Sequence, residues 1–160
     1  MSLPPNAWAV PSSRRLNLAS GPNILPNFLN MDLPDWRFED GLPFEDGSIE
    51  AITESHGLMY VAKKDWPFVF SEIARVLEPG GIVRITEDDT ANPDSERYGG
   101  WYDAVTLTSP KLVAQHLRKA KLKPIEQLAR TTAFKDQSLL QHWHGAPPKV
   151  FFCEGIKPNA

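Results

Sequence analysis

The sequence has a single cysteine, Cys153, so the chain cannot form an internal disulfide bond, and a reducing compartment suits it. It has no apolar run near the roughly 18 residues that a membrane helix needs. Its N-terminus also lacks the charged start and apolar stretch of a signal peptide. We therefore expect a cytoplasmic protein with no membrane partner.

An excess of positive charge is also missing. The chain has 17 Lys and Arg against 20 Asp and Glu, which gives a formal net charge of -3. Tight binding to a phosphate backbone needs clustered basic side chains on one surface. Nucleic acid is therefore not expected as a main partner.

The 160 residues contain no internal repeat, and this length favours one compact core over two ordinary domains. Residues 1–13 contain three prolines and almost no periodicity, which predicts an extended N-terminal arm. Trp8 either anchors this arm or is exposed. We expect residues 14–160 to form a single domain.

Two strand-like runs, at about residues 15–18 and 28–31, flank a turn of small residues, Ala19-Ser20-Gly21. Small side chains let a ligand approach the backbone, and Asp32 ends the second run with a carboxylate. This arrangement is typical of sites for adenosine-type cofactors. Parallel neighbours usually need at least about 10–12 connecting residues, and about nine are available here. Either the usual helix is vestigial, or the strands are not parallel neighbours.

A strand is predicted over residues 49–55, and it ends in the polar pair Ser55-His56. From Asp65, the expected N-cap, apolar residues recur at helical spacing: Trp66, Val69, Phe70, Ile73, Ala74 and Leu77. Pro79-Gly80-Gly81 is expected to stop the helix and lead into a strand over residues 82–86. That strand would deliver Glu87, Asp88 and Asp89 to the carboxyl edge of the sheet, where open α/β sheets bind ligands.

The remaining sequence predicts a loop over 92–101 that is long enough for a lid, with aromatic residues that favour a flat or apolar ligand: Tyr98, Trp101 and Tyr102. Ser109-Pro110 is expected to start a helix to about Ala120, and a strand is predicted at 124–129. Residues 139–144 and 150–156 are predicted to form a hairpin that closes one edge of the sheet. His142, His144 and Cys153 are too few, at unrecognised spacing, for a metal site, so we expect none.

These motifs, in this order, resemble class I S-adenosylmethionine-dependent methyltransferases, and most closely the small methyltransferase-type-11-like branch. The residues that carry the resemblance, over about 14–120, are Leu-Asn-Leu-Ala-Ser-Gly at 16–21, Asp32, Leu42-Pro43-Phe44 with Asp46 and Ser48, Ser55-His56, and Glu72-Ile73-Ala74-Arg75-Val76-Leu77-Glu78-Pro79-Gly80-Gly81. The resemblance implies an α/β fold: a three-layer, Rossmann-like, seven-stranded sheet with helices on both faces. The sheet would be mostly parallel with an antiparallel C-terminal strand, and its N-terminal crossovers would be shortened.

The resemblance also implies S-adenosyl-L-methionine as cofactor, bound across the carboxyl ends of the first, second and fourth strands. Ala19, Ser20 and Gly21 would pack under the methionine part, and Asp32 would accept hydrogen bonds from the ribose hydroxyls. Ser55 and His56 would border the sulfonium and adenine, while Trp36, Asp35 or Asp40 would flank the adenine.

Three features depart from the family pattern. Ala19 replaces the first glycine of the turn and Asn17 an acid before it. The first crossovers are short, and Met59-Tyr60 replaces the usual His-Leu pair. We expect an open cleft, weak affinity, or shelter from the arm or from a second copy of the chain in a homodimer.

Methyl transfer is an in-line displacement, in which positioning supplies most of the acceleration and a base is needed only for acceptors that lose a proton. His56 is either that base or a hydrogen-bonded residue of the scaffold. Asp88 and Asp89 either orient an acceptor or form a solvated turn. The acceptor is expected to be a small molecule of unidentified chemistry.

Two other functions are open. One is a catalytically degenerate methyltransferase fold that serves as a binding or assembly module. The other is a nicotinamide-dependent enzyme, which is disfavoured because no Gly-x-Gly-x-x-Gly opens a full helix after the first strand.

Overall fold

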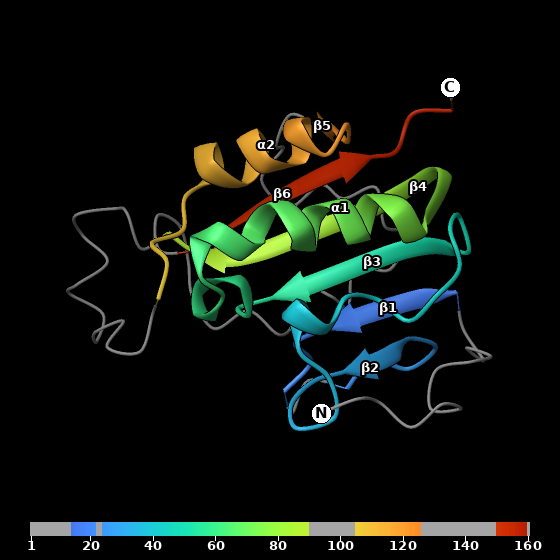
Figure 1. Cartoon of the computed structure of the whole chain (residues 1–160), viewed down its shortest axis with the longest axis horizontal. Coiled ribbons are helices and arrows are strands. Elements are labelled where there is room, and N and C mark those ends of the chain that lie inside the picture. Colours follow the sequence, from blue (N-terminus) through green and yellow to red (C-terminus); the bar gives the residue numbers. More distant parts are fainter. Residues whose placement is uncertain (1–13, 22–23, 90–104, 126–149, 160) are drawn as a thin grey trace.

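A computed structural model describes residues 14–21, 24–89, 105–125 and 150–159. Within these residues the chain forms one six-stranded sheet in the order β2-β1-β3-β4-β6-β5 (Figure 1). The strands are β1 (Arg15–Leu18), β2 (Leu29–Met31), β3 (Ile49–Ser55), β4 (Leu77–Asp88), β5 (Lys123–Ile125) and β6 (Val150–Ile156). The predicted α/β class is confirmed.

The first four strands are parallel neighbours, and β6 runs antiparallel to both β4 and β5. A mostly parallel sheet with an antiparallel C-terminal strand was predicted and is found. The predicted hairpin partner at 139–144 lies outside the described residues. The prediction that 150–156 close an edge of the sheet is wrong, because β6 lies between β4 and β5.

β1 and β2 are parallel neighbours, although the described residues between them, 19–21 and 24–28, contain no helix. Of the two alternatives that the short spacing left open, the vestigial helix is therefore the correct one. The shortening continues after β2, where the short 3-10 helix η1 (Phe38–Asp40) is the regular structure before β3 within the described part of the chain.

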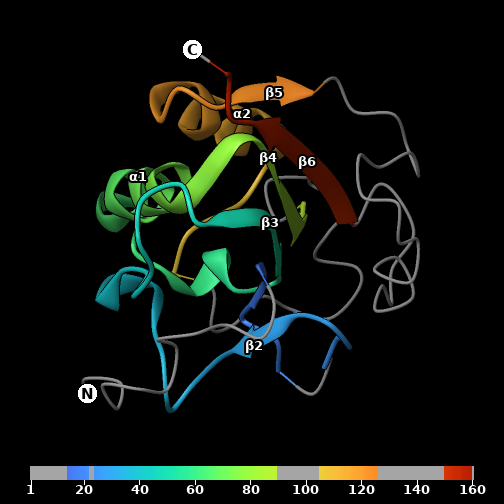
Figure 2. The same ribbon diagram turned by 90° about the vertical axis from the view of Figure 1, so that its right-hand side faces the viewer.

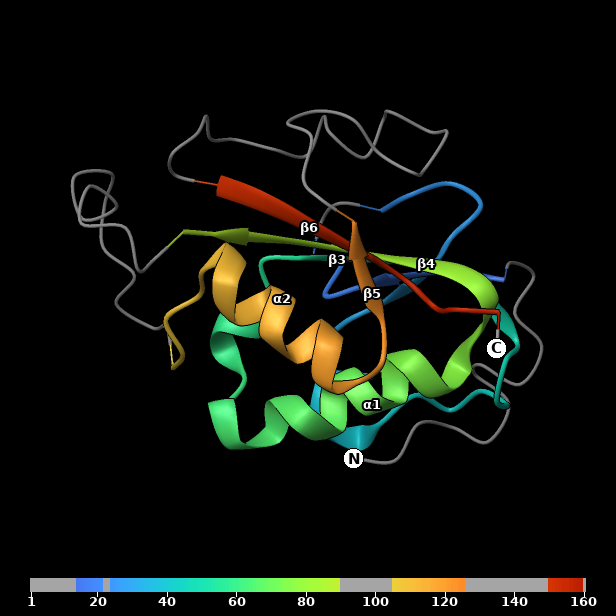
Figure 3. The same cartoon turned by 90° about the horizontal axis from the view of Figure 1, so that it is seen from above.

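The two α-helices, α1 (Trp66–Val76) and α2 (Pro110–Lys119), lie on the same face of the sheet (Figure 2, Figure 3). On the opposite face, Leu25 and Phe28 of the short first crossover pack against Ala51 and Ile82. The third layer near these residues is thus an irregular segment. Neither α-helix of the described residues is long and apolar enough to cross a bilayer.

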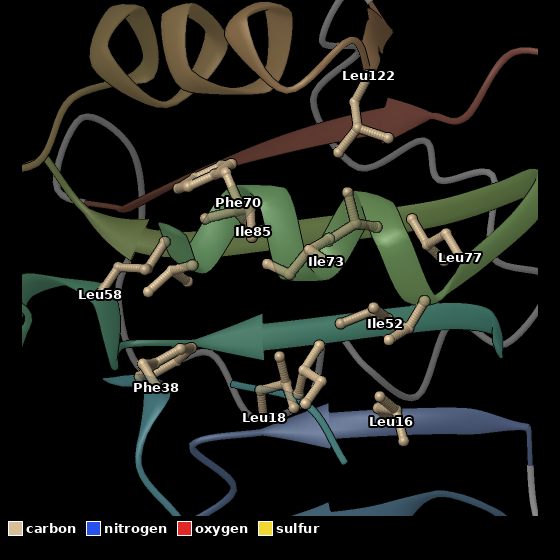
Figure 4. Close-up of a cluster of buried hydrophobic side chains, with 14 of the residues drawn as sticks. Leu16, Leu18, Phe38, Ile52, Leu58, Phe70, Ile73, Leu77, Ile85 and Leu122 are labelled. Atoms are coloured by element: carbon tan, nitrogen blue, oxygen red, sulfur yellow. The ribbon is translucent and has the colours of Figure 1, made fainter. Parts of the chain in front are cut away.

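The main core lies between α1 and the sheet (Figure 4). Leu16, Leu18, Ile52 and Ile85 alternate with polar residues along their strands and so point to one face, where Phe70 and Ile73 of α1 cover them. Along α1 the buried side chains are Trp66, Val69, Phe70, Ile73 and Val76. The predicted apolar face is thus found, with Val76 in addition.

One predicted cap and one predicted helix end need correction. α1 begins directly after Asp65 as predicted, but the Asp65 side chain makes no capping hydrogen bond, because the 3-10 helix η3 (Lys63–Asp65) leads directly into α1 with helical backbone angles. Pro79-Gly80-Gly81 does not end the helix, since β4 already begins at Leu77 and pairs with Ile49. The three residues instead form an irregularity inside β4, and Gly80 has a φ of 82°.

The start of α2 agrees with its prediction. Ser109 is the N-cap, and its Oγ accepts a hydrogen bond from Leu112 N at 3.1 Å. Pro110 occupies the first turn, where its missing N–H does no harm.

Candidate functional site

A pocket of about 530 Å³ opens at the carboxyl ends of β1, β2 and β3. Because the three strands are parallel, the residues that follow each of them meet at one edge of the sheet. The pocket is lined by Ala19, Ser20, Gly21, Asp32, Leu33, Trp36, Arg37, Phe38, Glu39, Ser55, His56, Gly57, Tyr60 and Val61.

Seven of the predicted site residues are brought together in this lining: Ala19, Ser20, Gly21, Asp32, Trp36, Ser55 and His56. Asp40 is not part of the lining, since its carboxylate turns back to accept a hydrogen bond from Arg37 N at 3.1 Å. Asp88 is also absent from the lining. Tyr98, Trp101 and Tyr102 lie outside the described residues.

The first wall is the turn after β1. Ala19 and Gly21 both have left-handed backbone angles, with φ of 56° and 51°. Such a conformation is costly for a residue with a Cβ, so Ala19 is held there by its surroundings. Gly21 N donates to Asp32 Oδ2 at 2.7 Å, and Ser20 N donates to Met31 O at 3.3 Å. These bonds fasten the turn to β2.

Asp32 therefore has one role that the structure shows directly, because its Oδ2 fixes the turn. A carboxylate offers about four acceptor positions on two oxygens, so it can accept further hydrogen bonds. Asp32 also faces the pocket. The structural role of Asp32 leaves room for a contact with a ligand.

The second wall follows β2 and is aromatic. Trp36 and Phe38 pack with ring centroids 4.8 Å apart, and Trp36 Nε1 donates to Gly41 O at 2.8 Å. Arg37 and Glu39 add opposite charges beside them. Of this wall only Trp36 was among the predicted candidates, and Asp35 is not in the lining. The others were missed because the segment has neither helical nor strand periodicity.

The third wall begins at the end of β3 with Ser55 and His56. Ser55 Oγ lies 2.7 Å from His56 Nδ1, and His56 Nε2 lies 3.5 Å from Asp88 Oδ1. Burial lowers the pKa of His56, but the hydrogen bond and charge of Asp88, with a smaller contribution from Glu87, outweigh it and raise the pKa above 6.5. Asp88 is buried and acts on the pocket through His56. Asp89 follows β4, and partial burial raises its pKa.

Below this wall lie two glutamates that the sequence interpretation did not single out as site residues. Glu54 and Glu87 are completely buried and accept hydrogen bonds from the backbone of residues 57–59. Period-two alternation would have found them, because Glu54 continues the face of Ile52, and Glu87 continues the face of Val83 and Ile85.

Asn17, which stands where the family often has an acid, is also accounted for. Its Nδ2 donates to Asn30 Oδ1 at 2.8 Å. Asn17 is therefore engaged in holding β2 beside β1. Among the described residues, no group of three or more His, Cys, Asp or Glu side chains is arranged to bind a metal ion.

Comparison with known proteins adds a family match. Residues 14–85 match the family described as methyltransferase domain. The chain is 28% identical over 134 residues to demethylmenaquinone methyltransferase of Lactococcus lactis subsp. lactis strain IL1403. The matched region covers 74% of this chain and 52% of that protein. The chain thus spans about half the length of the curated relative that it matches.

Solved structures share the fold. Phosphoethanolamine N-methyltransferase 2 of Haemonchus contortus, in complex with S-adenosyl-L-methionine, matches with a TM-score of 0.62 at 14% identity, over 99% of this chain and 50% of that one. A SAM-dependent methyltransferase of Thermotoga maritima matches with a TM-score of 0.59 at 17% identity, over 92% and 84% of the two chains.

Proposed function

We propose, from the premise that this chain belongs with the class I S-adenosylmethionine-dependent methyltransferases, that it binds S-adenosyl-L-methionine and transfers its methyl group to a small-molecule acceptor. The observation that carries the proposal is the convergence of three strand ends on one pocket, lined by seven residues that the sequence had singled out. We propose a single domain over residues 14–160, in the cytoplasm, and a second copy of the chain as a candidate partner.

The lining fits the cofactor by its chemistry. The small residues Ala19, Ser20 and Gly21 would lie under the methionine part, and Asp32 would accept hydrogen bonds from the ribose. The face beside Trp36 and Phe38 offers flat apolar surface to an adenine ring. Asp40 is no longer a candidate for this face, because its carboxylate is directed to Arg37 N.

The bound cofactor supplies an electrophilic methyl carbon, and the remaining chemistry belongs to the chain. The pocket walls would orient the acceptor and exclude water, which is the main requirement of an in-line displacement. For an acceptor that loses a proton, neutral His56 would be the base, and Asp88 would position the ring and stabilise the imidazolium. Because the pKa of His56 is raised, this base would need a higher pH than an ordinary histidine to be neutral.

Calorimetric titration with S-adenosylhomocysteine tests the cofactor site. The native chain should bind, and Asp32→Asn should bind at least about tenfold more weakly, since hydrogen bonds to a charged group contribute about 1.5–3 kcal/mol. Asp35→Asn is the matched control, because Asp35 is exposed and outside the lining. No binding at millimolar ligand, or equal affinities for the two variants, would contradict the proposed site.

The second candidate function is a degenerate methyltransferase fold that acts as a binding or assembly module. It is favoured by Ala19 at the family's glycine position and by the use of Asp32 to fasten the turn. Transfer of a radiolabelled methyl group to any amine, hydroxyl or carbon acceptor in a panel of small molecules would exclude it. Binding of S-adenosylhomocysteine without any methyl transfer would favour it.

A further inference from the structure

Two buried carboxyl groups lie beneath the third wall of the pocket. Glu54 on β3 and Glu87 on β4 are both 0% exposed, and neither lines the pocket itself. A charge without solvent is costly unless hydrogen bonds compensate for it. The partners of these two groups therefore indicate what they do.

Those partners are the backbone N–H groups at the start of the 3-10 helix η2 (Leu58–Tyr60). Gly57 N donates to Glu54 Oε1 at 2.7 Å and to Glu87 Oε2 at 3.1 Å. Leu58 N donates to Glu54 Oε1 at 3.0 Å, and Met59 N donates to Glu87 Oε1 at 3.1 Å. N–H groups at a helix start have no intrahelical acceptor, so the two side chains supply the acceptors from below.

The four carboxyl oxygens are not equivalent. Both oxygens of Glu87 accept a backbone N–H, whereas Glu54 uses only Oε1 in this way. Glu54 Oε2 is buried and receives no backbone N–H within the described part of the chain. It is therefore the oxygen through which Glu54 can take part in a proton shared with Glu87.

Two negative charges at this depth would repel each other with no solvent to screen them. Burial raises the pKa of both carboxyl groups, and the charge of Glu54 and its hydrogen bond to Glu87 raise the pKa of Glu87 further, while the same hydrogen bond lowers the pKa of Glu54. The other titratable group that acts on the pair is His56, whose charge lowers the pKa of Glu87, and Asp88 lies 3.5 Å from His56 Nε2. One proton shared by the two glutamates removes the repulsion and keeps every backbone bond.

We propose that Glu54 and Glu87 are positioning residues: they share one proton between their carboxyl groups, and together fix the turn that places His56 and Tyr60 in the pocket wall. This inference rests on the cofactor site proposed above. The outer side of the turn is held separately, because Val105 N and Thr106 N donate to Met59 O at 2.8 and 3.0 Å. Without the glutamates, the N–H groups of residues 57–59 would lose their acceptors.

Glutamine substitutions in the full-length chain test the asymmetry. Glu54→Gln keeps one acceptor oxygen for Gly57 N and Leu58 N and offers an NH₂ group to Glu87 in place of the shared proton, so it should preserve the wall. Glu87→Gln puts an NH₂ group against the N–H of Gly57 or Met59 and leaves a buried donor unpaired. Glu50→Gln is the matched control, because Glu50 also lies on β3 but pairs with Arg15 at the partly exposed amino end.

The first readout is hydrogen exchange of the Leu58 and Met59 amides, which needs no ligand. Protection factors should stay within about twofold of the native chain in Glu54→Gln and fall about 10- to 100-fold in Glu87→Gln. The second is affinity for S-adenosylhomocysteine, which should follow the same order. If no variant binds the ligand, the proposed function fails, whereas the exchange data still decide on the glutamates.

Glu54→Gln alone can overturn the inference. A tenfold loss of protection in this variant, or its failure to fold, would show that the two carboxyl groups do not share a proton through Glu54 Oε2. Equal protection in Glu87→Gln and Glu50→Gln would show that Glu87 does not hold the turn. A loss in Glu87→Gln that Glu54→Gln does not share supports the inference.

Discussion

The connection from β1 to β2 and the connection from β3 to β4 both join parallel neighbours, but different forces hold them. The second connection contains α1, which covers the sheet with a continuous apolar face. The first has no helix in its described residues, and Leu25 and Phe28 are its buried apolar side chains there. A short crossover cannot bury enough apolar surface to hold itself, so it needs other contacts.

The first crossover finds those contacts in one side chain of β2. Asn30 Oδ1 accepts hydrogen bonds from Asn17 Nδ2 and Leu25 N, and Asn30 Nδ2 donates to Leu25 O and Phe28 O. The oxygen of the side-chain amide thus accepts two hydrogen bonds and its NH₂ group donates two, so the amide is fully used. The comparison shows that a hydrogen-bonded asparagine takes the place of helix packing in the amino-terminal half of the sheet.

The largest loss of stability should come from a substitution in α1, the helix of the connection from β3 to β4. Ile73→Ala empties a core position that is 1% exposed, and should lower the free energy of unfolding by about 2–5 kcal/mol. Ile73→Val should cost only about 0.5–1.5 kcal/mol. Urea denaturation followed by circular dichroism measures both. A smaller loss of stability for Ile73→Ala than for Asn30→Ala would reverse the contrast between the two crossovers.

Asn30→Ala should cause the second largest loss in the free energy of unfolding, about 2–3 kcal/mol. Four hydrogen bonds are lost, and each contributes about 1 kcal/mol or less when its partner regains water. Asn30→Asp keeps the acceptor oxygen but sets a carboxylate oxygen against the carbonyl oxygens of Leu25 and Phe28, so it should also destabilise the fold. The same urea titrations apply. A near-zero effect of Asn30→Ala would mean that the crossover is held by its apolar contacts after all.

Gly57→Ala should cost about 2 kcal/mol, because it overpacks the point where the two crossovers touch. A Cβ there would lie 2.5 Å from Ala19 Cβ and 2.9 Å from Phe38 Cε2. In an Ala19→Gly background the cost should shrink, since one of the two close contacts is gone. A double-mutant cycle measures the coupling, and strict additivity would show that the two residues do not meet.

The smallest effect is the pH dependence of stability that arises from His116, where α2 packs against α1. His116 of α2 is buried against Trp66 and Phe70 of α1, and burial, followed by the charges of Lys119 and Lys63, lowers its pKa below 6.5. The unfolded chain then takes up a proton before the folded chain does, so stability should fall as the pH drops below 6.5 towards the folded pKa.

His116→Leu should remove this part of the pH dependence. His56 contributes with the opposite sign: its raised pKa gives stability at low pH that is lost as the pH rises through the folded value. Urea midpoints of the native chain and of His116→Leu, compared between pH 5 and 8, isolate the His116 contribution. Parallel pH profiles of the two proteins would exclude it.

Much of the fold could be predicted from the sequence, because local patterns carried it. The apolar residues of β3, the helical spacing of α1 and the Ser109-Pro110 start of α2 are each readable within a few residues. The end of α1 and the Asp65 cap were mispredicted because they depend on other segments: η3 replaces an Asp65 cap, and pairing with Ile49 draws Leu77 into β4.

The site was predictable where a residue follows directly on a strand, as for Asp32 and His56. It was not predictable where a side chain turns back on its own loop, as Asp40 does towards Arg37. Period-two alternation places Glu54 and Glu87 on the buried face, but the meeting of their carboxyl groups depends on the pairing of β3 with β4. Two acids far apart in the sequence carry no local sign that they will share one environment.

Ala19 and Gly57 also constrain how this sequence can change. With alanine at position 19, any side chain at position 57 meets a Cβ at 2.5 Å, so the two positions are epistatic. A lineage could acquire a larger residue at 57 only after position 19 had become glycine, and the reverse order would pass through a destabilised intermediate. The order of substitutions at the floor of the pocket is therefore set by the contact of two methyl-sized groups.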